Sequence, residues 1–226
     1  MRFEDLCWFD LEEYLKEDDR ILFITGACEQ HAYLSLLTDI KIPLALADEA
    51  SRVTGVPVAP PLNFGISPYF LDFPGTLSLS VETFLRVVEE LLESAYQQGF
   101  RRFLILNGHG GNHPLTEKLT EMANRLPDIN IRFHAWFESS SVQEVIRKQG
   151  LEGGHANWLE AFSFTRVRAL PEREKEPVEM ESFLPAEQVK SALGDGSFGG
   201  RYLQDDAVLE EIFQAALGDI LALLKF

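Results

Sequence analysis

The sequence predicts an α/β domain in which a largely parallel sheet lies between layers of helices. Short apolar runs, typical of buried strands, alternate along the chain with longer segments of helical periodicity. The 226 residues are 46% hydrophobic and 25% charged, which is the composition of an ordinary globular chain with a sizeable core. No internal repeat or linker divides the chain, so we expect a single domain over residues 1–226.

Four short apolar runs are expected to form the strands. The first, residues 20–25, ends at Gly26, and the second, residues 56–59, is stopped by Pro60 and Pro61. The other two predicted strands are residues 101–106 and 129–137. Because helical segments separate most of these runs, the sheet is expected to be largely parallel.

The helices are expected from apolar residues spaced three and four apart. The clearest one begins after Ser80, which suits an N-cap, has Glu82 in its first turn and ends at Gly99. Another covers residues 43–53, with Pro43 in the first turn, where proline is tolerated. The remaining predicted helices are residues 114–126, 139–149 and 206–224.

The segments between these elements are predicted as loops, with one segment left open. Residues 63–75 are expected to form an ordered loop, and residues 194–200 a glycine loop. Residues 171–181, rich in proline and glutamate, are expected to be exposed. Residues 158–167 fit either a helix or a strand.

The charge balance excludes some partners. With 36 acidic against 20 basic side chains, the net charge of −16 argues against a nucleic-acid or anionic-membrane surface, because both partners are polyanions. Two cysteines without a CxxC pair do not form a disulfide scaffold. The first ten residues do not resemble a signal peptide, and no apolar run is long enough for a membrane span. We therefore expect a cytoplasmic protein.

Two motifs rich in possible metal ligands begin where predicted strands stop. Glu29 and His31 come just after the first strand, with Asp39 eight residues beyond His31. His109 lies in an Asn-Gly-His-Gly-Gly-Asn motif just after the strand at 101–106. Sites in open α/β sheets lie outside the carboxyl ends of the strands, so these four side chains are expected to converge.

Imidazole nitrogens and carboxylate oxygens suit zinc, manganese or iron. An aspartate can bridge two ions through its two oxygens, and two ions about 3.5–4 Å apart can activate a shared water and polarise a carbonyl. Each motif alone also fits a simpler interpretation, an exposed Glu-x-His or a glycine-rich turn that cradles phosphate. No dinucleotide-binding or P-loop glycine pattern is present, and the pairing of both motifs at strand ends favours the metal site.

Four motifs follow one another between Glu29 and Glu160. They are Glu-Gln-His followed by Thr-Asp (29–31 and 38–39), Phe-Pro-Gly-Thr-Leu-Ser-Leu-Ser (73–80), Asn-Gly-His-Gly-Gly-Asn (107–112), and His-Ala with a glutamate four residues after the alanine (155–160). In these motifs and in their order the chain resembles the creatininase (creatinine amidohydrolase) family. The C-terminal third resembles this family less clearly.

The resemblance implies a three-layer α/β/α sandwich and a homo-oligomer, often a hexamer. It implies hydrolysis of a non-peptide C–N bond in a small molecule, either an amide, a cyclic amide or a formamide. It also implies two divalent metal ions per chain (Zn, Mn or Fe), with a bridging hydroxide that attacks the amide carbon.

The resemblance further implies roles for single residues. One ion would be held by Glu29 and His109 and the other by His31, with Asp39 bridging the two. The remaining assignments are Glu160, as a further ligand of the second ion, and His155, as the general acid and base that carries a proton to the leaving nitrogen.

Several positions depart from the family pattern. The stretch 32–37 is one residue shorter than in relatives, and Gly111 stands where creatininase has an acidic ligand. Trp158, Phe70 and Tyr33 stand where relatives are polar or small. We therefore expect a substrate with a more apolar or planar part than creatinine. The residues expected to contact the substrate are Phe70, Trp158, Tyr33 and Asn107.

The sequence leaves two other functions open. The shortened stretch and Trp158 also fit a catalytically altered, oligomer-forming member that keeps the fold and binds metal. A nucleotide-binding α/β protein is the third possibility, and the missing phosphate-loop pattern speaks against it. His113 fits either a pocket or a helix cap, whereas structural roles are expected for His134, Trp136 and Cys28.

Overall fold

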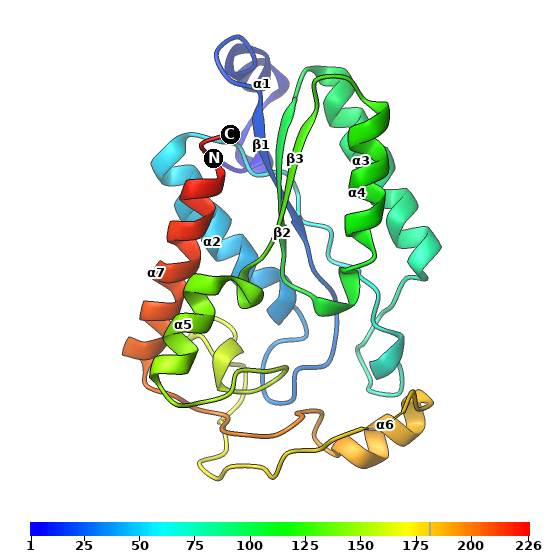
Figure 1. The fold of residues 1–226 in the computed structure, drawn as a ribbon, viewed down its shortest axis with the longest axis vertical. Coiled ribbons are helices and arrows are strands. Elements are labelled where there is room, and N and C mark those ends of the chain that lie inside the picture. Colours follow the sequence, from blue (N-terminus) through cyan, green and yellow to red (C-terminus); the bar gives the residue numbers. More distant parts are fainter. Residues whose placement is uncertain (181) are drawn as a thin grey trace.

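The computed structural model describes residues 1–180 and 182–226. Its sheet has three parallel strands, β1 (Arg20–Thr25), β2 (Arg102–Asn107) and β3 (Asn130–Ala135), adjacent in that order (Figure 1). The strands are aligned in register, since Thr25 pairs with Asn107 and Asn107 with Ala135. All three strands therefore end at the same edge of the sheet, and the segments that follow them enter the same region.

Helices cover both faces of the sheet (Figure 1). One face carries α2 (Thr38–Thr54), α5 (Ser140–Lys148) and α7 (Asp206–Leu223), and the other carries α3 (Val81–Gln98) and α4 (Leu115–Arg125). Two further helices, α1 (Trp8–Tyr14) and α6 (Ala186–Leu193), lie at opposite ends of the molecule. The predicted three-layer α/β/α sandwich is confirmed.

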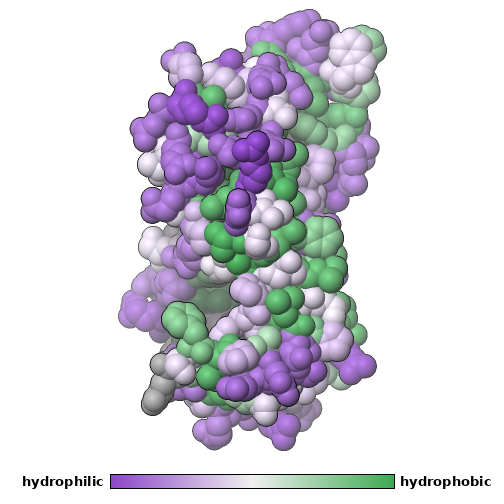
Figure 2. Space-filling view, turned by 90° about the vertical axis from the view of Figure 1, so that its right-hand side faces the viewer, coloured by the Kyte–Doolittle hydropathy of each residue, from purple (hydrophilic) through white to green (hydrophobic). Residues whose placement is uncertain are grey.

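The alternation of side chains along the strands separates two hydrophobic cores. Leu22, Ile24, Leu104 and Leu106 face the layer of α2, α5 and α7. Ile21, Phe23, Phe103 and Ile105 face the layer of α3 and α4. Figure 2 shows the side of the molecule that α3 and α4 cover, with a hollow between this layer and the lower part that carries α6.

Most elements lie within a few residues of their predicted bounds, and three differ. Residues 56–59 join β1 only at the isolated bridge between Val58 and Leu22, because Pro57, Pro60 and Pro61 lack the N–H that a continuous ladder needs. The helix α2 begins five residues earlier than predicted, so Pro43 lies inside it and not in its first turn. Residues 158–167 form neither a helix nor a strand but begin with a single turn, Trp158–Glu160.

Two helices, α1 and α6, were not predicted, because each is short and carries few buried residues. The segment predicted to be exposed at 171–181 is mostly exposed as far as residue 180, and Glu181 lies outside the described residues. In the part of the chain that the structure covers, no helix combines the length and apolar character that crossing a bilayer requires.

Two glycines bring the start of α2 against the ends of β1 and β2. A Cβ placed on Gly26 would lie 2.3 Å from the carbonyl oxygen of Asp39, and one placed on Gly108 would lie 2.0 Å from the same atom. Glycine permits this close approach because it has no side chain. The packing brings Asp39 directly beneath the loops that follow the two strands.

We expect Gly108→Ala to lower the free energy of unfolding by about 1–3 kcal/mol, because the new methyl group would displace the backbone of Asp39. Gly110→Ala is the matched control, since a Cβ at Gly110 meets nothing within 4 Å. Urea unfolding of both variants in the presence of a chelator measures the difference. Equal stability of the two variants would contradict the close packing at Gly108.

Candidate metal centre

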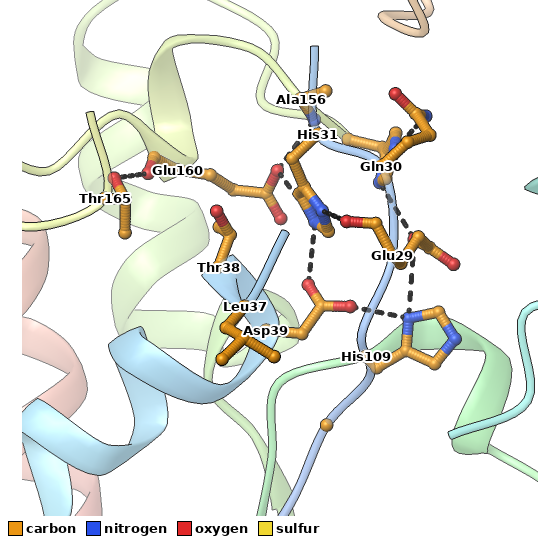
Figure 3. Close-up of polar contacts among 12 residues, drawn as sticks. Glu29, Gln30, His31, Leu37, Thr38, Asp39, His109, Ala156, Glu160 and Thr165 are labelled. Carbon is orange, nitrogen blue, oxygen red and sulfur yellow. Dashed lines mark hydrogen bonds and ion pairs between the residues drawn. The ribbon is translucent and has the colours of Figure 1, made fainter. Parts of the chain in front are cut away.

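The five predicted metal ligands lie together at the edge of the sheet where the strands end (Figure 3). Glu29 and His31 belong to the loop after β1, and His109 to the loop after β2. Asp39 lies in the first turn of α2, and Glu160 ends the short turn Trp158–Glu160 that follows α5. All five side chains are buried, although each carries a charge or can carry one.

Asp39 lies at the centre of this cluster. Its Oδ1 is 2.8 Å from Nε2 of His31, and its Oδ2 is 2.8 Å from Nδ1 of His109 (Figure 3). Glu29 Oε1 lies 3.7 Å from Nδ1 of His109, on one side of Asp39. Glu160 Oε2 lies 3.8 Å from Nε2 of His31, on the other side.

These distances define two groups of possible ligands that share Asp39. Glu29, Asp39 and His109 form one group, and His31, Asp39 and Glu160 form the other. A third group, which does not include Asp39, is formed by Glu29, His31 and His155. Within each group the ligand atoms lie within 4.8 Å of one another. Two nitrogen–oxygen ligand sets joined by a carboxylate are the arrangement that a pair of divalent ions requires.

Backbone carbonyls fix which nitrogen of each imidazole faces the cluster. Nδ1 of His31 lies 3.0 Å from the carbonyl oxygen of Glu29, and Nε2 of His109 lies 2.8 Å from that of Ile66. In each ring the nitrogen at the carbonyl donates its N–H, so the other nitrogen faces Asp39. Metal-binding histidines are commonly oriented by such a bond from the second ring nitrogen.

Buried atoms without hydrogen-bond partners test whether ions fit this cluster. Among the described residues, Glu29 Oε2, His31 Nε2 and Asp39 Oδ2 are buried and make no well-aligned hydrogen bond, although the last two lie within ion-pair distance of a neighbour. Leaving such atoms unsatisfied is costly unless another partner takes them up. Metal ions between these atoms would satisfy all three, so the residues present fit the group.

In the metal-free cluster, burial and the neighbouring charges shift the pKa of each histidine in opposite directions. Burial lowers the pKa of His31, but the carboxylates of Asp39 and Glu160 outweigh it and raise the pKa to about 10. For His109, burial is outweighed in the same way by Asp39 and Glu29, and the pKa is raised to about 9. Burial raises the pKa of Glu160 to about 7. Without metal, two cationic imidazoles therefore neutralise the buried carboxylates.

His155 lies beside the cluster and against an aromatic wall. Its ring stacks on Phe70, with centroids 4.7 Å apart and an interplanar angle of 11°, and Phe198 meets it edge-on at 6.0 Å. Burial and the neighbouring His31 lower the pKa of His155 well below its usual value, so the ring is neutral at pH 7. Its Nδ1 lies 3.5 Å from Oε1 of Glu29.

A cavity of about 380 Å³ opens onto this cluster, a volume suited to a small molecule. The ligand-type residues that line it are Glu29, Asp39, His109, His155 and Glu160. The large apolar side chains that line it are Tyr69, Phe70, Phe137, Leu159 and Phe198, and the polar ones at its rim are Glu138 and Gln143. The cavity is therefore lined by ionisable side chains of the cluster together with mostly aromatic side chains.

Of the four residues predicted to contact substrate, Phe70 lines this cavity and the other three lie elsewhere. Trp158 is 1% exposed and packs in the core beside α2, α5 and α7. Its indole N–H can be buried there because it donates to the backbone carbonyl of Glu152. Tyr33 lines a separate pocket. Asn107 is fully buried and donates to the carbonyl oxygen of His109 at 2.7 Å, so it holds the loop that carries His109.

Several lining residues were missed by the sequence reasoning. Phe198 lies in the predicted glycine loop and Tyr69 in the predicted loop at 63–75, and an aromatic residue in a glycine-rich loop is a signal that could have drawn attention. Gln143 lies on α5 among residues of ordinary helical periodicity. Its place at the cavity depends on tertiary packing and has no local signal.

The remaining histidines, together with Trp136 and Cys28, lie outside the cluster. Nε2 of His113 lies 2.9 Å from a carboxylate oxygen of Glu138, and both side chains are half exposed. His134 lies on β3, where burial lowers its pKa, and Trp136 packs in the core. The thiol of Cys28 donates a hydrogen bond to a backbone carbonyl at 3.3 Å, and Cys28 belongs to none of the ligand groups.

The sequence matches a family model described as creatininase (creatinine amidohydrolase) over residues 4–224. It is 25% identical over 152 residues to the 3-dehydro-scyllo-inosose hydrolase of Thermotoga maritima, covering 66% of this chain and 49% of that protein. It is 29% identical over 115 residues to the creatinine amidohydrolase of Pseudomonas putida, covering 48% and 44%. The matched part thus spans about half the length of these curated relatives.

Solved structures agree on the fold. A structure described as creatininase Mn superposes with a TM-score of 0.82 at 20% identity, over 99% of this chain and 97% of that one. A putative creatinine amidohydrolase from Bacteroides fragilis superposes with a TM-score of 0.78 at 24% identity, over 100% and 95%. With a family match over nearly the whole chain and this shared fold, the chain belongs to the creatininase family.

Proposed function

We propose that this protein hydrolyses a non-peptide C–N bond in a small amide, cyclic amide or formamide, using two divalent metal ions. The observation that carries the proposal is the pair of ligand groups that share Asp39 and open onto one cavity beside His155. The names of the relatives support hydrolysis, since they include a creatinine amidohydrolase, an inosose hydrolase and a peptide peptidase.

The chain's own residues would divide the metal binding between two sites. Glu29 and His109 would hold one ion, His31 and Glu160 the other, and Asp39 both. A side chain at Gly111, where creatininase has its acidic ligand, would lie 2.1 Å from a backbone oxygen, so Glu160 is the available substitute. When bound, the ions would supply Lewis-acid polarisation of the amide carbonyl and a nucleophilic water. Zinc, manganese and iron all suit these donors.

His155 is proposed as the general acid and base. Its low pKa keeps the ring neutral, so the ring would pass its one proton to the leaving nitrogen of the amide and recover a proton from the attacking water at the same nitrogen. The stack on Phe70 holds the ring plane. The position of the ring between Glu29 and the aromatic wall supports this role, since a substrate in the cavity would lie beside it.

The cavity supports a substrate with a flat apolar part. Phe70 and Phe198 meet edge to face, with centroids 6.2 Å apart and an interplanar angle of 77°, and Tyr69 stacks on Phe198 with centroids 6.3 Å apart. Aromatic side chains favour planar groups placed against their faces. We therefore propose a planar amide whose apolar part lies against these rings, with its carbonyl directed to the ligand groups.

We further propose that the protein is cytoplasmic and assembles into a homo-oligomer, with a hexamer as the expected state. Trp8 and Phe9 are 63% and 58% exposed, stack on each other and lie far from the cavity, so they suit a contact between copies of the chain. Light scattering after size-exclusion chromatography measures the mass. A monomer at micromolar concentration would contradict the proposal.

The proposed activity predicts dependence on both metal and His155. Chelation should abolish hydrolysis of the best substrate in a panel of formamides, cyclic amides and open-chain amides, and zinc or manganese should restore it. His155→Asn should lower kcat by about 10²- to 10⁴-fold with the metal content unchanged. Metal-replete wild-type protein that hydrolyses none of the panel would favour the non-catalytic, metal-binding alternative.

Metal affinity should rise with pH, because the ions compete with protons for the imidazoles. In the metal-free protein the pKa values of His31 and His109 are raised to about 10 and about 9, so both rings are protonated at neutral pH. Zinc binding should therefore release protons, and its apparent affinity should increase from about pH 6 toward pH 9. Titration calorimetry in buffers of different ionisation enthalpy measures the protons released. An affinity independent of pH would count against these two ligands.

A further inference from the structure

Gln30 lies between the proposed ligands Glu29 and His31, and its own side chain is buried. Its amide makes three contacts. Oε1 lies 3.1 Å from the backbone N–H of Ala32, and Nε2 lies 2.9 Å from the carbonyl oxygen of Gly196. Nε2 also lies 2.8 Å from Nε2 of His155.

The first two contacts determine which way the amide faces. A backbone N–H can only donate, so the atom beside Ala32 must be the amide oxygen. A backbone carbonyl can only accept, so the atom beside Gly196 must be the amide nitrogen. The second N–H of the same amide group is therefore free to donate to the ring of His155.

The orientation of the amide in turn determines where the proton of His155 resides. An amide NH₂ group has no acceptor, so Nε2 of His155 must accept the hydrogen bond with its lone pair. The neutral ring then carries its single proton on Nδ1. Nδ1 is the nitrogen that lies 3.5 Å from Oε1 of Glu29, on the side of the metal centre.

We propose that Gln30 is a positioning residue that sets the tautomer of His155, so that the ring presents a proton on Nδ1 toward the metal centre. The catalytic meaning of this tautomer rests on the proposed function, whereas the tautomer itself does not. The contact joins the motif after β1 to the loop after α5, two segments 125 residues apart.

The glycine loop at 194–200 holds this amide from the other side. Gly196 has φ +99°, in the region that favours glycine, and a Cβ there would lie 1.8 Å from Oε1 of Gln30. Phe198, from the same loop, packs edge-on against the ring of His155. The loop therefore fixes both Gln30 and the ring that Gln30 orients.

The test is the protonation pattern of His155 in zinc-loaded protein labelled with ¹⁵N-histidine. Long-range ¹H–¹⁵N spectra show which ring nitrogen carries the proton, and the signals absent from His155→Asn identify the residue. We expect a proton on Nδ1 and none on Nε2. A neutral ring with its proton on Nε2 in the wild-type protein would overturn the proposal.

Variants separate a positioning role from a merely structural one. Gln30→Glu keeps the shape of the side chain, but its carboxylate only accepts, so His155 should gain a proton on Nε2. The matched substitution at the exposed Gln98 should leave the His155 spectrum unchanged. An unchanged His155 spectrum in Gln30→Glu would also overturn the proposal.

A second pair of variants addresses the same contact if Gln30→Glu does not fold. Gly196→Ala should displace the amide and alter the His155 signals, whereas Gly194→Ala, whose Cβ meets nothing within 4 Å, should not. Equal spectra for these two variants would contradict the role of the loop. With an amide substrate in hand, Gln30→Glu should lower kcat at least about tenfold at unchanged zinc content.

The spectra need no substrate, so the two proposals fail separately. An inactive protein with the Nδ1–H tautomer would overturn the proposed hydrolysis and leave the role of Gln30 intact. An active protein with the Nε2–H tautomer would leave the proposed hydrolysis intact and overturn the role of Gln30.

Discussion

The buried carboxylate of Asp39 lies at the centre of the ligand groups, at the edge of the sheet where the strands end. Asp39 contacts His31 and His109 at 2.8 Å through different oxygens, and each of these rings has a further carboxylate beside it. Burying so many ionisable groups is costly unless each is neutralised, and in the metal-free protein the raised imidazole pKa values provide that balance. Divalent ions would provide it more completely, because they also satisfy the buried atoms that lack hydrogen bonds.

Backbone packing positions Asp39 at this edge of the sheet. Gly26 and Gly108 directly follow β1 and β2 and let the first turn of α2 approach closely. Pro43 cannot donate to the carbonyl oxygen of Asp39 four residues earlier, so that oxygen is free of the usual helical bond and lies against the two glycines. The parallel, aligned strands then bring the loops that carry His31 and His109 to opposite sides of the carboxylate.

The ligand groups could be predicted from the sequence because each ligand follows a strand or lies in a short motif. Parallel strands place their carboxyl ends at one edge, so residues far apart in sequence converge without further information. The cavity wall could not be predicted in this way, since Phe198 reaches His155 from a late loop through tertiary packing. Trp158 shows the opposite case, where a residue in a functional motif packs into the core. The bonds of Gln30 also depend on tertiary contacts, because both partners outside its own loop lie more than 100 residues away.

The central claim is that one carboxylate joins two metal sites, and metal counting tests it most directly. After dialysis against zinc, elemental analysis of the wild-type protein should give two ions per chain, and Asp39→Ala should retain none. Asp195→Ala removes a partly buried, ion-paired aspartate at a separate pocket and serves as the control, which should keep two ions. Full zinc content in folded Asp39→Ala protein would contradict the account.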